Sequence, residues 1–147
     1  TLCGSDSIGN NIYKYKWIDN KVQDPILLKS LPAYPDAIMH HGGAMTVGKD
    51  GTVYAVIGDQ DNQDFPRGAN ILQNQFGSPD DTGVILPIEP SGPYYAIGIR
   101  NSFGLATDPV TGNIWSTENG PHRMDEVNLV MPKFNSGWNA HSGPIAE

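Results

Sequence analysis

The chain has 147 residues, of which 9 are Lys or Arg and 16 are Asp or Glu, so its formal net charge is −7 at pH 7. This charge argues against nucleic acid and anionic membrane surfaces as partners, because both bind proteins rich in basic side chains. No apolar run approaches a membrane span in length. The chain opens without a basic and then apolar leader, so we expect any signal peptide to be absent or removed.

Turn-forming residues are frequent, since the chain contains 17 Gly and 12 Pro, and only 38% of its residues are hydrophobic. Its 3 Trp, 6 Tyr and 4 Phe are spread between the turns, which favours many short strands over a flexible chain. We therefore predict an all-β protein in which residues 1–147 form one domain or part of one. The single cysteine, Cys3, excludes an intrachain disulfide.

The first predicted strand covers residues 9–18. Tyr13, Tyr15 and Trp17 alternate with Lys14 and Lys16, which places the aromatic rings on one face. This pattern predicts a half-buried strand.

The opening of that strand recurs twice, each time after a turn. Gly9, Gly51 and Gly112 each begin a short segment that ends on an aromatic residue, and they lie 42 and 61 residues apart. These spacings bracket the length of a propeller blade, so we predict a β-propeller segment of roughly three four-stranded blades. Propellers close with about four to eight blades, so the chain is expected to be part of a larger ring.

A hairpin is predicted from strands at 44–47 and 53–57. His40 precedes its first strand and Asp59 follows its second, so a tight turn would return both residues to the same rim. A carboxylate that accepts from one imidazole nitrogen leaves the other nitrogen available as a base. The alternative is a surface histidine near a turn aspartate. A long polar loop is predicted to follow, over 59–82.

Two later stretches carry polar groups of other kinds. Arg100 and Asn101 lie between glycines after an apolar strand and suit a planar, oxygen-rich ligand, although a surface salt bridge is the alternative. Further along, carboxylates alternate with Gly, Pro and Asn over 118–128, which is a weak signal for calcium.

Taken together, these stretches resemble the soluble glucose/sorbosone dehydrogenases. The matching segments are His40 to Gly43, Asp50-Gly51, Gly58-Asp59, Gly98-x-Arg100-Asn101, Gly104-Leu105-Ala106, Glu118-x-Gly120-Pro121, Asp125 to Asn128 and Asn135-x-Gly137-Trp138. Members of that family are six-bladed propellers that use pyrroloquinoline quinone (PQQ) and calcium to oxidise the C1 hydroxyl of aldoses. The resemblance also implies a periplasmic or extracellular location and an external electron acceptor.

The resemblance implies a role for each matching residue. His40 would remove the proton of the sugar hydroxyl, and Asp59 would orient it. Arg100 would stabilise negative charge on the quinone oxygen, with Asn101 bonded to the cofactor beside it.

The resemblance further implies two calcium ions. One would bind backbone carbonyls of Gly120 and Pro121, and the second, structural ion would involve Asp125, Glu126 and a backbone oxygen near Ser136.

The chain departs from the family pattern in two respects. The strand at 83–87 lacks the basic residues that the family usually has there. Pro87 also removes a backbone hydrogen-bond donor, which predicts an edge or altered strand. The family's later arginines and lysine, which hold the cofactor's carboxylates, and an early glutamine match no residue present. About half of the cofactor site is therefore expected here, and remaining blades or a homo-oligomer would complete it. We expect weak or no catalysis from these residues alone.

Two other functions stay open at this point. A non-catalytic propeller related to hedgehog-interacting proteins would keep the scaffold for protein recognition, but it has no need of His40, Asp59, Arg100 and Asn101 together. A calcium-dependent lactone hydrolase would require side-chain carboxylates and amides converging on the metal, and the Gly120-Pro121 pair argues mildly against it.

Overall fold

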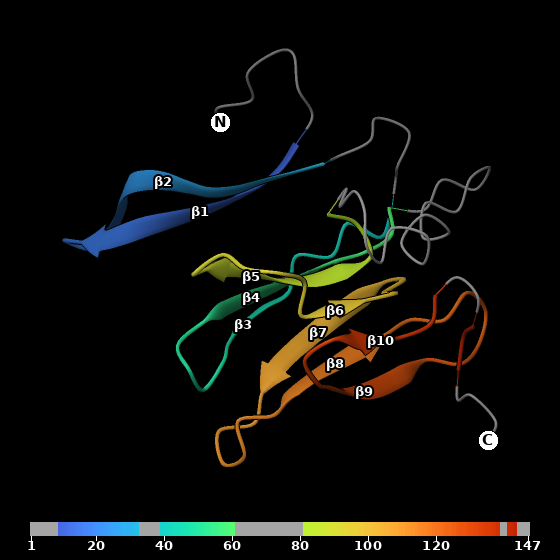
Figure 1. Ribbon diagram of the computed structural model, residues 1–147. Helices are drawn as coiled ribbons and strands as arrows, with labels where there is room; N and C mark the ends of the chain where they lie inside the picture. Colours follow the sequence, from blue (N-terminus) through green and yellow to red (C-terminus); the bar gives the residue numbers. More distant parts are fainter. Residues whose placement is uncertain (1–8, 33–38, 61–80, 139–140, 144–147) are drawn as a thin grey trace.

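The computed structural model describes residues 9–32, 39–60, 81–138 and 141–143, and within these ranges the regular structure consists of ten strands (Figure 1). The strands are β1 (Gly9–Ile18), β2 (Lys21–Pro32), β3 (Met45–Val47), β4 (Val53–Ile57), β5 (Val84–Glu89), β6 (Ala96–Ile97), β7 (Ser102–Thr107), β8 (Ile114–Glu118), β9 (Glu126–Val130) and β10 (Phe134–Asn135). No helix that could span a membrane occurs in the described part of the chain. The all-β prediction is confirmed, while most of the predicted 59–82 loop lies outside the described residues.

The strands form three sheets, with β1 and β2 in the first, β10-β6-β5-β4-β3 in the second and β7-β8-β9 in the third. The segment from β3 to β6 is an antiparallel meander of four strands, and β10 adds to it in parallel beside β6. Three sheets in chain order agree with the prediction of roughly three blades. In the described region the second sheet contains this four-stranded meander and β10, while the first and third sheets contain two and three strands.

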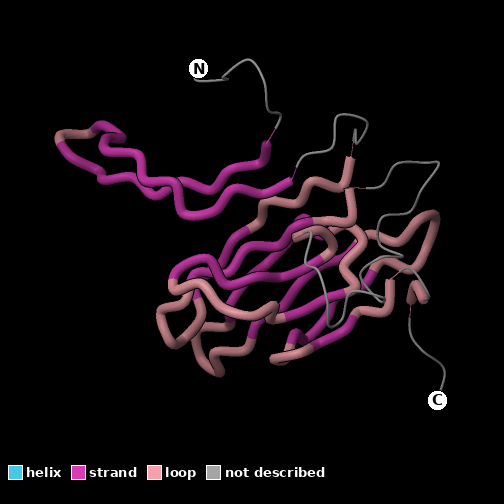
Figure 2. Tube along the Cα trace, turned by 45° about the horizontal axis from the view of Figure 1, so that its top comes forward, coloured by secondary structure: helices cyan, strands magenta, loops and turns pink. Residues whose placement is uncertain are grey.

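The core lies on both sides of the second sheet. One apolar cluster joins it to the third sheet and contains Tyr54, Val56, Ile85, Ala96, Ile99, Leu105, Ile114 and Val130. The other cluster contains Leu31, Ala55, Ile57, Val84, Leu86 and Ile88. Because successive side chains of β4 and β5 enter opposite clusters, both strands are almost continuously apolar. Figure 2 shows the second and third sheets close together, with the β1–β2 hairpin extending away from them.

The β1–β2 hairpin corrects two sequence-based expectations. β2 was not predicted, although Asp19 and Asn20 form the two-residue turn before it, with φ values of 50° and 56°. The aromatic face predicted to be half-buried is exposed, and Trp17 is 68% accessible. The opposite face meets β5, where Lys14 forms an ion pair with Glu89 at 2.8 Å. Alternation shows which side chains share a face but not which face packs.

Pro87 is accommodated differently from the expectation of an edge strand. β5 is the central strand of the second sheet, so the edge prediction is wrong. The strand is nevertheless altered at that position, because the register with β4 shifts between Val53 and Tyr54, where Tyr54 pairs with Pro87. β6 pairs only with Val84 and Ile85, so the missing N–H of the proline interrupts no ladder bond on that side.

Candidate functional site

His40 and Asp59 meet at the open end of the β3–β4 hairpin, as the sequence predicts. The hairpin pairs Met45 with Ala55 and Val47 with Val53, which returns the chain after β4 to the residues before β3. The Nδ1 atom of His40 lies 2.7 Å from Oδ1 of Asp59. The two residues are 7% and 0% exposed, so the alternative of a surface histidine is wrong.

Gly58 allows the backbones on either side of the pair to approach each other. A Cβ atom at this position would lie 2.2 Å from the carbonyl oxygen of His40 and 2.9 Å from that of Arg100. The backbone N–H of Asp59 donates to the same Arg100 oxygen at 2.9 Å. His40 itself has a φ of 61°, a conformation that costs free energy for a residue with a side chain and is held here by its surroundings.

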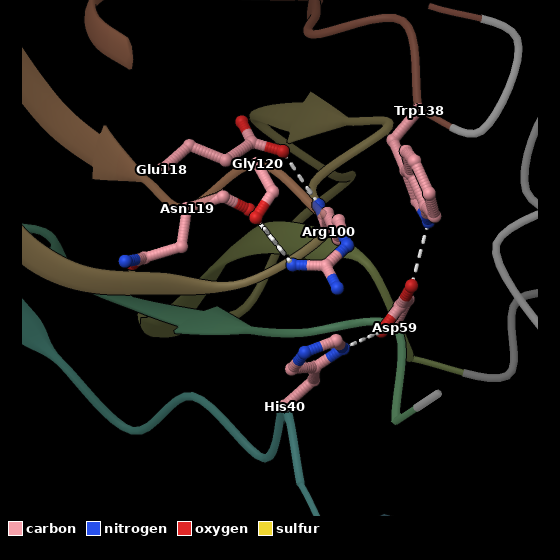
Figure 3. Close-up of polar contacts among 7 residues, drawn as sticks. All are labelled: His40, Asp59, Arg100, Glu118, Asn119, Gly120 and Trp138. Carbon is pink, nitrogen blue, oxygen red and sulfur yellow. Dashed lines mark hydrogen bonds and ion pairs between the residues drawn. The ribbon is translucent and has the colours of Figure 1, made fainter. Parts of the chain in front are cut away.

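Arg100 and Asn101 lie between β6 and β7, and Figure 3 shows Arg100 beside Glu118, Asn119 and Gly120. The Nη1 of Arg100 donates to the carbonyl oxygens of Asn119 at 2.9 Å and Gly120 at 3.2 Å, so carbonyls take the place of the salt bridge considered above. The Nε of Arg100 and the Oδ1 of Asn101 are buried without a hydrogen-bond partner in the described structure. Buried polar atoms without partners are costly, and a bound ligand is one way to satisfy them.

Glu118, to which the sequence analysis assigned no role, is central to the site. It ends β8, and its Oε1 accepts from the backbone N–H of Arg100 at 2.6 Å, while its Oε2 accepts from the Ser136 hydroxyl at 2.5 Å. Burial raises the pKa of Glu118; these two hydrogen bonds lower it in part, and the negative charges of Glu126 and Asp59 raise it further. The alternation of residues along β8 could have predicted its burial, because Ile114, Ser116 and Glu118 all point inward.

Trp138 is the second residue whose place the sequence analysis missed. Its Nε1 donates to Oδ2 of Asp59 at 2.6 Å, across 79 positions of the chain. Its ring lies 5.3 Å from the guanidinium carbon of Arg100. The Asn-x-Gly-Trp spacing around it indicated a motif but not a contact with residues so distant in sequence, and only the fold brings them together.

The residues predicted to bind calcium lie between β8 and β9, at the start of β9 and just after β10. Gly120, Glu126 and Ser136 line a small pocket together with Arg100 and Glu118. The other two, Pro121 and Asp125, are exposed on the loop between β8 and β9.

The side chains of these predicted ligands are already engaged. Asp125 accepts from the N–H of Gly120 at 3.0 Å. Glu126 accepts from Gly143 N–H at 2.5 Å and from the Asn128 amide at 2.9 Å. Within the ranges described above, no three His, Cys, Asp or Glu side chains converge as metal ligands.

The arrangement has the parts of a proton-accepting site beside a cationic one. The bond to Asp59 engages Nδ1 of His40, which leaves Nε2 as the nitrogen able to accept a proton. Arg100, whose guanidinium carbon lies 5.3 Å from the Trp138 ring, supplies a permanent positive charge nearby. Such an arrangement suits a substrate that loses a proton while negative charge develops on a second molecule nearby.

The sequence pattern of the Glucose / Sorbosone dehydrogenase family matches residues 7–144. This confirms the resemblance, and the chain belongs to that family of sugar dehydrogenases.

Two curated relatives illustrate the relationship. The chain is 27% identical over 106 residues to aldose sugar dehydrogenase YliI of Escherichia coli K12, covering 67% of this chain and 29% of the relative. It is 29% identical over 157 aligned positions to quinoprotein glucose dehydrogenase B of Acinetobacter calcoaceticus, covering 86% and 31%. The chain thus spans about a third of these relatives.

Solved structures support the fold. A PQQ-bound aldose sugar dehydrogenase of Streptomyces coelicolor is similar with a TM-score of 0.65 and 25% identity, over 84% of this chain and 37% of that one. The apo-form soluble aldose sugar dehydrogenase of E. coli is similar with a TM-score of 0.73 and 20% identity, over 90% and 41%. The architecture is therefore that of a propeller segment, as predicted.

Proposed function

We propose that this chain contributes part of the active site of a quinoprotein sugar dehydrogenase that oxidises the C1 hydroxyl of an aldose to the lactone. The observation that carries the proposal is the buried hydrogen bond between His40 Nδ1 and Asp59 Oδ1, 2.7 Å long. The family membership and the PQQ-bound relative support the quinone as hydride acceptor.

The proposed reaction divides between the chain and its cofactor. The chemistry that PQQ would supply when bound is an acceptor for the C1 hydrogen of the sugar and its two electrons. His40 takes the hydroxyl proton on Nε2, so that the C1–H and O–H bonds break as the C=O bond of the lactone forms. Asp59 holds the ring in the Nδ1–H tautomer and stabilises the positive charge that the imidazole gains.

The residues around Arg100 fit a quinone. The unpartnered Nε of Arg100 offers a hydrogen bond and a positive charge to an electron-rich oxygen, and the buried Oδ1 of Asn101 offers an acceptor beside it. A guanidinium is planar and always charged, so it can favour negative charge on a flat ligand without transferring a proton. We propose that Arg100 and Asn101 bind the cofactor in this way.

Calcium fits the described arrangement less well. The resemblance predicts it at the carbonyls of Gly120 and Pro121, but the Gly120 carbonyl accepts from the Arg100 guanidinium at 3.2 Å. A divalent cation at that oxygen would lie close to the positive charge of Arg100, and this repulsion disfavours its binding. We keep calcium as a prediction from the resemblance and assign it no step. The second ion, near Asp125, Glu126 and Ser136, is likewise kept as a prediction from the resemblance and is assigned no step.

Other aspects of the function stay predictions. The use of an external electron acceptor, the periplasmic or extracellular location, and completion by further blades or another copy all rest on the resemblance. The alternative of a non-catalytic binding module is not favoured, since the chain keeps a buried His–Asp pair and an arginine with an unpartnered Nε at one rim.

His40→Ala tests the proposal in protein expressed from its full reading frame and reconstituted with PQQ and calcium. We expect glucose-dependent dye reduction to fall at least about 100-fold, as for loss of a general base, while PQQ binding measured by absorbance titration survives. His122→Ala, which changes an exposed histidine, is the matched control. Turnover retained in His40→Ala would remove this residue from its proposed role.

A further inference from the structure

Trp138 contacts both the His40–Asp59 pair, through Asp59, and Arg100 (Figure 3). Its indole Nε1 donates to Asp59 Oδ2 at 2.6 Å, and its ring lies 5.3 Å from the guanidinium carbon of Arg100. Its backbone N–H donates to the Gly98 carbonyl at 3.2 Å, which ties it to the turn that carries Arg100. We infer that Trp138 is a positioning residue that fixes the proton-accepting pair and the cation relative to each other. The inference rests on the proposed function.

The contact with Asp59 fixes the orientation of the carboxylate. One oxygen of Asp59 bonds to His40 and the other bonds to Trp138, so the carboxylate plane is held from both sides. A hydrogen bond to an ionised acceptor is stronger than one between neutral groups. The indole N–H does not ionise in the working pH range, so it orients Asp59 without exchanging a proton with the pair.

The contact with Arg100 limits where the guanidinium can go. Nη1 is bonded to the carbonyls of Asn119 and Gly120, and the indole ring packs near the same group. A cation near an aromatic face is attracted by the ring's quadrupole, and tryptophan provides the strongest such face. These contacts use Nη1 and the π face but not Nε, which stays available for a ligand.

Trp138 supplies both contacts from one side chain. Phenylalanine would keep an aromatic face near Arg100 but has no donor for Asp59, and alanine would provide neither. Trp138→Phe and Trp138→Ala therefore separate the two effects. Trp115→Phe is the matched control, because Trp115 lies on β8, is 40% exposed and belongs to a different sheet from the His40 hairpin.

The first readout is the Nδ1–H proton of His40, observed by NMR in ¹⁵N-histidine-labelled protein from the full reading frame without quinone or sugar. In Trp138→Phe we expect this proton to exchange with water at least about tenfold faster, because the Asp59 acceptor loses a hydrogen bond that helps to orient it. Loss of packing elsewhere would not produce this selective change. The control should keep the signal unchanged.

The second readout is kinetic. In reconstituted protein we expect Trp138→Phe to lower kcat for dye reduction roughly tenfold with KM within twofold, as for a group that acts on geometry rather than sugar binding. Trp138→Ala should in addition weaken PQQ binding, since Arg100 loses its aromatic neighbour.

A third measurement needs no variant. The indole N–H of Trp138 should exchange more slowly than those of Trp115 and Trp17, which are 40% and 68% exposed. Exchange as fast as that of Trp17, or an unchanged His40 Nδ1–H signal in Trp138→Phe, would overturn the inference. Since the NMR readouts need no cofactor, failure of the sugar dehydrogenase proposal would leave them intact, and the two failures are distinguishable.

Discussion

Gly58→Ala tests whether the close approach of two loops is needed for the site. The new methyl group would lie 2.2 Å from the His40 carbonyl oxygen, whereas ordinary contact begins at 3.4 Å. Relief of that contact requires a displacement of about 1.2 Å, the difference between these two distances. The φ of Gly58 lies outside the left-handed region, so the substitution adds crowding and no backbone strain of that kind.

This displacement acts on both sides of the site, because the Arg100 carbonyl lies only 2.9 Å from the same methyl position. A misplacement of about 1 Å can lower a rate about 100-fold, and we expect kcat for dye reduction to fall by that order. Overpacking should also lower the free energy of unfolding by about 1–3 kcal/mol.

The assay compares dye reduction at saturating glucose and PQQ with urea unfolding of the same preparation. Gly9→Ala is the control, since its nearest neighbour would lie 3.6 Å away, which is ordinary contact. A Gly58→Ala protein with turnover within twofold of the wild type and an unchanged free energy of unfolding would refute the reasoning.

Three other changes test separate parts of the structure. Glu118→Ala leaves the N–H of Arg100 and the hydroxyl of Ser136 without their acceptor, so unfolding by urea should become easier by roughly 3 kcal/mol, and Glu118→Gln should recover part of that loss. No change in Glu118→Ala would contradict the buried network. Arg100→Met removes a positive charge next to the Gly120 carbonyl oxygen. If calcium binds at that oxygen, its affinity measured by calorimetry should rise about tenfold or more. An unchanged affinity would mean that any calcium binds elsewhere. Hydrogen bonds lower the pKa of Asp108, so its contribution to stability is present above the ordinary aspartate pKa and is lost as the pH falls through the lowered value. Asp108→Asn should therefore lose less stability than the wild type between pH 6 and pH 3, and equal losses would contradict this.

Much of the fold follows from local chemistry. Apolar runs bounded by turns predicted β3 and β4, and the tight turn between these strands was enough to predict that His40 and Asp59 share one rim. β2 was missed because its charged and proline-containing sequence has little strand signal, and its pairing depends on the two-residue turn at Asp19 and Asn20.

The sequence by itself determined the all-β class, the repeat that indicates blades, the His40–Asp59 pair and the family to which the chain belongs. These depend on local periodicity or on short motifs read in order. Only the tertiary structure decided which face of β1 packs, that β5 is central despite Pro87, and that Glu118 and Trp138 join the site. The reason is physical: a contact such as that between Trp138 and Asp59 links positions 79 residues apart and forms only after the sheets have stacked.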